Sequence, residues 1–315
     1  MKIENFDFYN STSIKSYNLE EKIRYQLKML DGLDAFTRKH CENVASITCR
    51  LCEYLHLDYG FTVYCITCAY LHDIGKLFIP PSVLQKAGKL TQEEYEIMKT
   101  HTTLGYKACM KDPKLRSYAA GALYHHEALD GSGYPNGTSG KKIPYEAQII
   151  RVADEFEAIT SKRQYKTHVG IVETLNILID HAKPSTPNSK TNKPKFLSSL
   201  VSVGKIDKKV LKALFKVVID DTEYEISQRC QYVDFLKKEL KRLKSAMKYY
   251  EKWQATSSLD KKEYLSQSAN YILHKNESLE KLPLILKETH KAYTVRVAHI
   301  EKLYDEVKQI KNLRV

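Results

Sequence analysis

The sequence predicts an all-α protein, and three observations support that fold class. Gly (12) and Pro (9) are scarce among the 315 residues, so long helices meet few breakers. Apolar residues recur at spacings of three and four along much of the chain, which is typical of amphipathic helices. No segment shows a convincing alternation of apolar and polar residues, the pattern that indicates a half-buried strand.

Individual helices can be placed in the first half of the chain. Helical spacing is clear in residues 19–33 and again in 38–57, and the run LDYG at 57–60 predicts the end of the second helix. The run TQEE at 91–94 is a capping-box signature because a Thr is followed three residues later by a Glu. It predicts the start of a helix that continues through His101.

The chain is predicted to contain an arm, a main domain and an extension. Residues 1–18 are polar without clear periodicity, which indicates an N-terminal arm. Residues 19–224 are expected to form the main domain, with an exposed loop at 181–200 that is rich in Pro, Ser, Asn and Lys. Residues 225–315 change to long, Lys- and Tyr-rich helices and form a C-terminal extension.

Two short apolar stripes run through the extension. Both have 4-3-4-3 spacing, and they consist of Leu236, Leu240, Leu243, Met247 and Tyr250 and of Tyr293, Val297, Ile300, Tyr304 and Val307. They are shorter than the three or four heptads that indicate a coiled coil. We therefore expect an antiparallel helical pair packed on itself or on the main domain, with a homodimer or a protein partner through 225–315 as the alternative.

The charge and the N-terminus limit the classes of protein. Fifty Lys and Arg against 38 Asp and Glu give a net charge of +12, which suits an anionic ligand, a nucleic acid or an acidic membrane surface. Charge alone does not choose among these or exclude a solvated basic surface. The first residues lack an apolar signal region, and no apolar run is long enough to span a membrane. We expect a cytoplasmic protein.

The cysteines form two CxxC pairs that resemble a zinc ribbon. Cys49 and Cys52 make one pair, and Cys65 and Cys68 make the other. Both pairs lie in apolar helical patterns, where a free thiol packs as a small hydrophobic side chain. We therefore interpret them as reduced core residues, because the chain has seven cysteines and no export signal.

Histidine and aspartate residues gather in short motifs that suit a metal site. His72 and Asp73 directly follow an apolar helix, and two further histidines are adjacent in the run YHHEALDGSGYP. Neighbouring side chains on a helix point about 100° apart, so they can serve two different ions. Imidazoles and carboxylates without thiolates favour Fe, Mn or similar ions. Two divalent ions would leave such a site positive, which suits a phosphodiester.

These motifs resemble the HD-GYP subgroup of the HD hydrolase superfamily. The resemblance rests on HDIGK, IPPSVLQKAGKLTQEE, HTTLGY, HHEALDGSGYP and VADEF in this order, and it covers roughly residues 20–220. The upstream run LDAFTRKHCENV is similar to the first helix of the family, with Asp34, Thr37 and His40 in register. The resemblance implies an HD-type helical bundle over the main domain, which then reads as an HD-GYP catalytic domain.

The resemblance also implies roles for individual residues. The positions that match the family's metal ligands are His40, His72, Asp73, His101, His125, His126 and Asp154, with Asp73 as the bridging carboxylate. Lys76 matches a lysine that points into the metal site, where it holds the scissile phosphate or protonates the leaving oxygen. The positions that match substrate contacts are Asp34, Gly133, Tyr134, Pro135, Arg163 and Lys166. The plain alternatives are a turn lysine, an ordinary Gly-Tyr-Pro turn and surface charges.

Some positions depart from the family pattern. Phe36 stands where some members carry a Glu that completes a third metal site, so the resemblance favours two ions, Fe or Mn first and Mg, Zn or Ni as alternatives. Glu157 replaces the usual Asp after the VAD motif, and Ala128 stands where Arg is common. These changes affect the expected substrate contacts and leave the ligand set complete.

The function implied by the resemblance is metal-dependent hydrolysis of cyclic di-GMP to pGpG, with further hydrolysis to GMP left open. One alternative is another cyclic dinucleotide such as cyclic GMP-AMP. Another is a regulatory module that binds the nucleotide and signals through residues 225–315. No duplex nucleic acid and no membrane span are expected.

Overall fold

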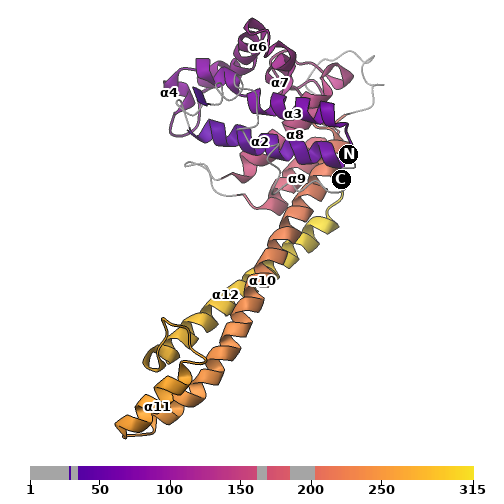
Figure 1. Cartoon of the computed structure of the whole chain (residues 1–315). Coiled ribbons are helices and arrows are strands. Elements are labelled where there is room, and N and C mark those ends of the chain that lie inside the picture. Colours follow the sequence, from indigo (N-terminus) through magenta and orange to yellow (C-terminus); the bar gives the residue numbers. More distant parts are fainter. Residues whose placement is uncertain (1–27, 30–34, 162–168, 185–202) are drawn as a thin grey trace. The chain divides into compact units, whose positions relative to one another are not determined.

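The computed structural model describes residues 28–29, 35–161, 169–184 and 203–315, and every regular element within them is a helix (Figure 1). This confirms the predicted all-α class. The α-helices are α2 (Ala35–Tyr54), α3 (Tyr59–Leu71), α4 (Pro81–Leu84), α5 (Gln92–Lys99), α6 (His101–Lys111), α7 (Ala119–Tyr124), α8 (Tyr145–Thr160), α9 (Ile171–Ala182), α10 (Lys208–Gln254), α11 (Leu259–Ala269) and α12 (Leu282–Asn312). Short 3-10 helices are η3 (Ile74–Phe78), η4 (Arg116–Tyr118), η5 (Gly140–Lys142) and η7 (Leu279–Lys281).

The chain divides into two compact units. The first comprises residues 1–218 together with 313–315, and the second comprises residues 219–312. The division falls inside α10, as does the domain boundary predicted at residue 224, which stays a prediction.

The first unit is built around α2, α3 and α8, which pack on one another. Helix α7 packs on α3 and α8, and α6 packs on α7 and on η3. Fully buried Leu and Ile side chains of these helices form the core, among them Leu51, Leu71, Ile74, Ile149 and Ile150. Full burial of such a side chain contributes about 1.5–3 kcal/mol, so the apolar face of each helix fixes its position.

Local signals explain where two of these helices start. Asp58 caps α3, because its carboxylate accepts a hydrogen bond from the backbone N–H of Phe61 at 2.9 Å. Residues 57–60 were expected to end the preceding helix, but Tyr59 and Gly60 already belong to α3. The predicted capping box at 91–94 is confirmed at the start of α5.

The helix expected to run from this box through His101 is instead two helices. Helix α5 ends at Lys99 and α6 begins at His101. Between them, Thr100 donates both its backbone N–H and its hydroxyl to the carbonyl of Ile97, at 3.0 and 2.6 Å. This local bonding tightens the chain at Thr100 and makes His101 the first residue of a new helix.

The thiols of the two CxxC pairs are core side chains. Cys49, Cys52, Cys65 and Cys68 are all buried, and burial raises the pKa of Cys49 to about 12. Within the described residues, no cysteine belongs to a set of three or more side chains whose ligand atoms lie close enough together to hold a metal ion. This supports the interpretation of these residues as packing residues.

Parts of the predicted arm and loop lie outside the described residues. The arm at 1–18 is one of them. Of the loop predicted at 181–200, residues 185–200 also fall outside, whereas His181 and Ala182 are helical and end α9. The loop therefore begins later than predicted.

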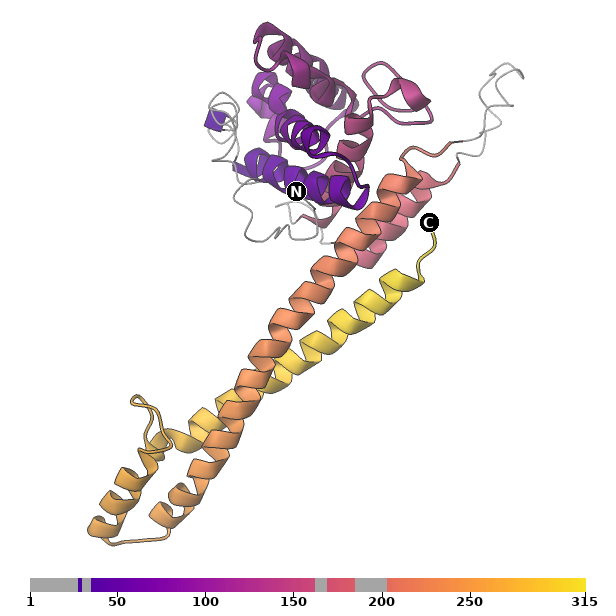
Figure 2. The ribbon, with the colours of Figure 1, turned by 45° about the vertical axis from the view of Figure 1, so that its right-hand side comes forward.

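In the second unit, α10 and α12 lie side by side and run in opposite directions, and α11 lies in the connection between them (Figures 1 and 2). Ile226 of α10 packs in one apolar cluster with Ile300, Leu303 and Val307 of α12. A second cluster joins Leu243 and other residues of α10 to α11, η7 and α12. The expected packing of the two helices on each other is thereby confirmed.

The apolar stripe of α12 differs from the predicted one in its register. Ile300, Leu303, Val307 and Ile310 are buried, whereas Tyr304, which the predicted stripe included, is 56% exposed. The tyrosine lies on the solvent side because Leu303 and Ile310 complete the buried face. Among the helices of the described residues, none combines the length and the apolarity that a bilayer crossing requires.

Candidate metal centre

Helix ends and helix interiors of the first unit bring the predicted ligands together. His40 lies within α2, and Asp154 lies within α8. His72 is the C-cap of α3, and Asp73 follows it as the N-cap of η3. His101 opens α6, His125 is the C-cap of α7, and His126 comes next in the chain.

The ligand atoms form two groups. His40, His72 and Asp73 make one, and His101, His125 and His126 make the other. Within each group the nitrogen and oxygen atoms lie within 4.8 Å of one another. These are the two groups of this kind within the described residues.

Asp73 lies between the two groups. Its Oδ2 is 3.5 Å from His40 Nε2 and 3.4 Å from His72 Nε2, whereas its Oδ1 is 3.4 Å from His101 Nε2. Each oxygen of this carboxylate therefore faces a different group.

Asp154 also has one oxygen toward each group. Its Oδ1 is 3.0 Å from Nε2 of His40, and its Oδ2 is 3.9 Å from Nδ1 of His126. The resemblance implied Asp73 as the bridging carboxylate, and in the structure Asp154 likewise directs one oxygen toward each group.

Hydrogen bonds to the backbone orient three of the imidazoles. Nδ1 of His72 lies 2.6 Å from the carbonyl of Ala69, and Nδ1 of His101 lies 2.7 Å from the carbonyl of Met98. Nδ1 of His125 is similarly placed, 3.0 Å from the carbonyl of Ala122. A carbonyl only accepts, so Nδ1 carries the proton and Nε2 of the neutral ring keeps its lone pair for an ion.

His40 is oriented by a carboxylate instead. Its Nδ1 bonds to Oε2 of Glu157, and Oε1 of Glu157 accepts a hydrogen bond from the side-chain amide of Asn43 at 2.9 Å. Burial opposes the protonation of His40, but hydrogen bonds with Asp154 and Glu157 raise its pKa to about 9.

The remaining groups favour the neutral imidazoles and ionised carboxylates that metal ions need. Burial lowers the pKa of His101 and His125, and it lowers the pKa of His126 to about 3. Burial alone would raise the pKa of Asp73, but Lys76 and His72 hold it well below its usual range. Burial alone would also raise the pKa of Asp154, but the hydrogen bond and the charge of the neighbouring His40 lower it well below its usual range.

Lys76 points at the carboxylate of Asp73. Its Nζ lies 2.5 Å from Oδ2 of Asp73. Burial opposes its charge, but Asp73 raises the pKa of Lys76, so the ammonium group is charged at neutral pH. Gly75, the residue before Lys76, allows the start of α6 to pack closely on η3, since a Cβ on Gly75 would lie 1.8 Å from the carbonyl oxygen of His101.

The Gly133-Tyr134-Pro135 loop lies against the adjacent histidines. The Tyr134 ring stacks on the His126 ring at 4.7 Å between centroids, and the Tyr134 N–H donates to the His126 carbonyl at 3.2 Å. A Cβ on Gly133 would lie 2.3 Å from the backbone nitrogen of Ala128, so only glycine allows this close packing. Lys99 Nζ lies 5.8 Å from the centre of the Tyr134 ring.

Two buried or half-buried charges hold this loop. The carboxylate of Glu127 accepts the backbone N–H groups of Asn136 and Thr138, at 2.7 and 2.9 Å. Arg151 donates to the carbonyls of His126 and Glu127, at 2.9 and 3.1 Å. These contacts fix the segment that carries His126.

Some predicted site residues lie outside the described residues. These are Asp34, Arg163 and Lys166, whose proposed substrate contacts stay predictions. Thr37 is buried, and the Phe36 side chain is 41% exposed.

The sequence did not indicate the supporting roles of Glu127, Arg151 and Glu157. Glu157 was noted as a departure from the family pattern, without a contact. Its partner His40 is 117 positions away in the chain, and Arg151 reaches a carbonyl 25 positions away. The one available signal was the place of Glu127 and Glu157 inside or beside the HHE and VAD motifs.

Comparisons with known proteins find one family and several relatives that this chain resembles. The family described as the HD domain matches residues 17–185. The cyclic di-GMP phosphodiesterase of Thermotoga maritima is 44% identical over 135 residues, which are 42% of this chain and 37% of that protein. The 3'3'-cGAMP-specific phosphodiesterase 1 of Vibrio cholerae is 35% identical over 167 residues, 51% of this chain and 38% of that protein.

Solved structures also resemble the chain. The HD domain of the phosphodiesterase PgpH from L. monocytogenes, in complex with cyclic-di-AMP, has a TM-score of 0.42 and 19% identity. The match covers 60% of this chain and 91% of that chain. The chain spans less than half the length of the curated relatives it matches.

Proposed function

Because this chain belongs to the HD domain family, we propose that it is a metal-dependent phosphodiesterase whose preferred substrate is cyclic di-GMP. The observation that carries the proposal is the position of Asp73. One oxygen of its carboxylate faces His40 and His72, and the other faces His101. This arrangement supports a carboxylate shared between two ions.

The donor set fits divalent metal ions. HD-domain phosphohydrolases depend on metals, and the groups around Asp73 provide buried imidazoles with free Nε2 lone pairs. Asp73 and Asp154 are buried carboxylates whose negative charges a bound cation would offset, in addition to the neighbouring His40 and Lys76. We propose two ions, with Fe or Mn preferred over Mg, Zn or Ni because nitrogen and oxygen ligands occur together.

Each proposed ion has its own set of ligands. His40 and His72 would hold one ion, His101, His125 and His126 would hold the other, and Asp73 and Asp154 would contact both. When bound, such a pair supplies Lewis acidity toward the phosphoryl oxygens and a nucleophile from water at neutral pH.

The chain's own residues position the substrate beside this centre. The charged ammonium of Lys76 lies next to Asp73, where it can hold an anionic phosphate. This charge supports the phosphate-holding role of Lys76 more than the proton-donating role, since a raised pKa disfavours proton release. Tyr134 presents its ring beside His126, and Lys99 adds a positive charge at the same ring. A nucleobase can stack on such a ring.

The domain arrangement follows from the same proposal. We assign catalysis to residues 19–224, because every ligand discussed lies between His40 and Asp154. Residues 225–315 would provide no ligand to the ions, and contact with a second copy or another protein is a secondary role for them.

A turnover assay tests the proposal. Purified protein loaded with Mn or Fe is incubated with cyclic di-GMP, cyclic GMP-AMP and cyclic di-AMP, and linear products are separated by chromatography. We expect cyclic di-GMP to be cleaved fastest, to pGpG or on to GMP. Asp73→Ala should abolish turnover, whereas Asp180→Asn, which changes an exposed carboxylate of the same unit, should not.

The same assay separates the two alternatives. Faster cleavage of cyclic GMP-AMP would favour this nucleotide as the substrate. The Vibrio cholerae relative, which is named as 3'3'-cGAMP-specific, is the reason for testing it. Tight binding of a cyclic dinucleotide by metal-loaded protein, with no cleavage of any of the three, would refute the enzymatic proposal and favour a regulatory binding module.

A further inference from the structure

The second unit carries a lysine stripe that is distinct from the metal centre. Lys237, Lys241, Lys244 and Lys248 follow one another on α10 at spacings of four, three and four residues. At 1.5 Å per residue they extend over about 16 Å of one helix face. All four side chains are exposed.

These four lysines differ from the arginines of the same helix. Arg229 forms an ion pair with Glu225, and Arg242 forms ion pairs with Glu239 and Glu277. Among the residues that the structure describes, no carboxylate lies within 4 Å of any of the four lysine ammonium groups. Like charges at neighbouring helix positions destabilise a helix, so an anion bound here would relieve a repulsion present in the free protein.

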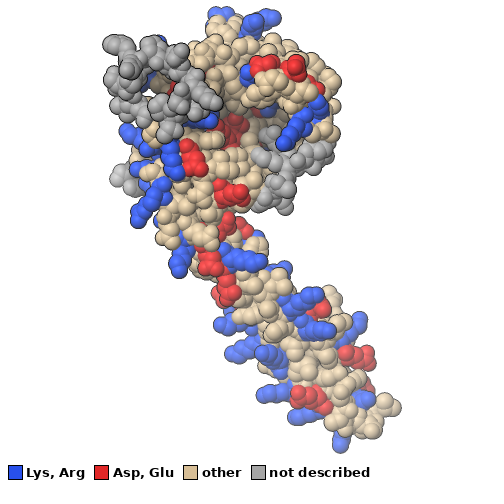
Figure 3. Space-filling model, turned by 180° about the vertical axis from the view of Figure 1, so that it is seen from behind, with Lys and Arg blue, Asp and Glu red and all other residues tan. Residues whose placement is uncertain are grey.

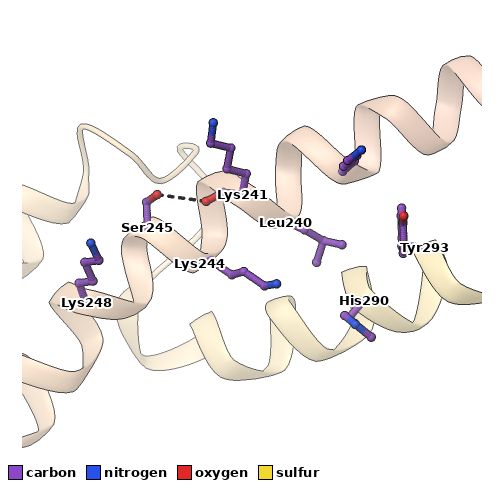
Figure 4. Close-up of a pocket in the computed structure, with 8 residues that line it drawn as sticks. Leu240, Lys241, Lys244, Ser245, Lys248, His290 and Tyr293 are labelled. Atoms are coloured by element: carbon purple, nitrogen blue, oxygen red, sulfur yellow. Dashed lines mark hydrogen bonds between the residues drawn. The ribbon is translucent and has the colours of Figure 1, made fainter.

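The stripe borders a groove between α10 and α12. The groove has a volume of about 520 Å³, and its lining contains the four lysines and Leu240 of α10 and His290 and Tyr293 of α12. Figure 4 shows Lys244 extending into the space between the helices, where Leu240, His290 and Tyr293 lie. In the same view Lys241 and Lys248, which also line the groove, point upward from α10. No acidic residue lines the groove.

The net charge of residues 225–315, the C-terminal extension that contains the groove, agrees with an anion site. Residues 225–315 hold 19 Lys and Arg and 12 Asp and Glu, a difference of +7 out of the +12 of the whole chain. Basic side chains follow the helical pair on the face seen in Figure 3. The groove therefore lies in the part of the chain that contributes most of the positive charge.

The chemistry of the lining indicates the class of ligand. Lysine ammonium groups act as point charges with three rotatable donors, which suits phosphate oxygens arranged in several directions. The groove volume falls within the range of about 300–1,000 Å³ for small-molecule sites. Tyr293 and Leu240 add an apolar surface against which a planar base can lie.

We propose that this groove binds a multiply phosphorylated anion of nucleotide size, such as a nucleoside triphosphate. The phosphates contact the ammonium groups of Lys241, Lys244 and Lys248, and the base lies toward Tyr293. The proposal does not depend on the proposed hydrolysis, because none of these residues belongs to the metal centre.

Equilibrium binding to the full chain tests this assignment. The probes are a fluorescent GTP analogue, inorganic tripolyphosphate as a competitor, a labelled single-stranded oligonucleotide, and vesicles with and without an anionic lipid. The double variant Lys241→Glu/Lys244→Glu reverses the charge of two lysines that line the groove. The matched control is Lys302→Glu/Lys308→Glu, which makes the same charge change at exposed positions of α12 outside the groove.

We expect saturable binding of the GTP analogue that weakens with added NaCl and is displaced by tripolyphosphate. Reversal of the lysine pair should weaken it by about tenfold or more, and the control pair by less than about threefold. Tyr293→Ala should weaken the GTP analogue more than tripolyphosphate. Helix content measured by circular dichroism shows that each variant is folded.

Three outcomes would overturn the assignment. The first is the absence of saturable binding, which would make the stripe a solvated basic face. The second is equal weakening by the groove pair and the control pair. The third is binding of the oligonucleotide or of anionic vesicles without binding of the GTP analogue or tripolyphosphate, which would assign the stripe to a macromolecular surface.

Discussion

The Glu157→Gln substitution tests how the candidate metal centre is held in place. His72, His101 and His125 direct Nδ1 to backbone carbonyls, whereas His40 directs it to the carboxylate of Glu157. Glu157 also accepts a hydrogen bond from Asn43 at 2.9 Å. A glutamine has one accepting oxygen, so its NH₂ group would have to face either the imidazole N–H or the Asn43 amide, and one donor would lose its partner.

The expected loss follows from the bond that is removed. A hydrogen bond to a charged group contributes about 1.5–3 kcal/mol. A defect in the residues that orient a metal ligand costs about 10–100-fold in metal affinity or activity, which is consistent with that energy. We therefore expect the affinity for Mn, measured by competition with a chromophoric chelator, and kcat/KM to fall within this range.

The control for this prediction is Glu173→Gln. Glu173 is an exposed residue of α9 in the same unit, so its loss of charge should leave both quantities unchanged. If Glu157→Gln keeps wild-type metal affinity and wild-type kcat/KM, His40 does not depend on Glu157 and the reasoning is wrong.

Three further substitutions test other parts of the structure. Lys76→Met removes the ammonium beside Asp73 and should lower kcat by about 100-fold while metal content by elemental analysis stays constant; an unchanged kcat would make Lys76 a turn residue. Gly133→Ala places a Cβ 2.3 Å from a backbone nitrogen, so it should displace Tyr134 and lower kcat/KM by about tenfold or more, whereas Gly170→Ala, with no atom within 4 Å, should not. Hydrogen bonds with Arg242 lower the pKa of Glu277, so Glu277 stabilises the second unit above pH 4.5 and this contribution is lost as the pH falls through its lowered pKa. Glu277→Gln should therefore cost about 1 kcal/mol at pH 7 and less at low pH, measured by unfolding followed through the fluorescence of Trp253, the single Trp of the chain; an equal loss at both pH values would contradict this.

The sequence predicted the parts of the site that depend on local motifs. The HDIGK and HHE motifs lie at helix ends, and the structure brings His72, Asp73, His125 and His126 together as these motifs implied. The all-α class was also predictable, because apolar residues follow helical spacing over most of the chain and the helix breakers Gly and Pro are scarce.

Contacts between distant segments could not be predicted. The pairing of His40 with Glu157 depends on how α2 packs on α8, and no local pattern encodes that packing. The division at Thr100 arises from hydrogen bonds of that residue to Ile97, although the apolar spacing continues across it. The register of α12 was missed because Tyr304 is apolar enough to fit a stripe, but Leu303 and Ile310 fill the buried face.

The central claim is that Asp73 is shared between two metal ions. Anomalous diffraction from crystals of the Mn-loaded protein tests it most directly. We predict two peaks about 3.5–4 Å apart, one beside His40 and His72 and one beside His101 and His125, with one Asp73 oxygen bound to each ion. A single peak, a third ion of full occupancy, or two ions without Asp73 between them would contradict the account.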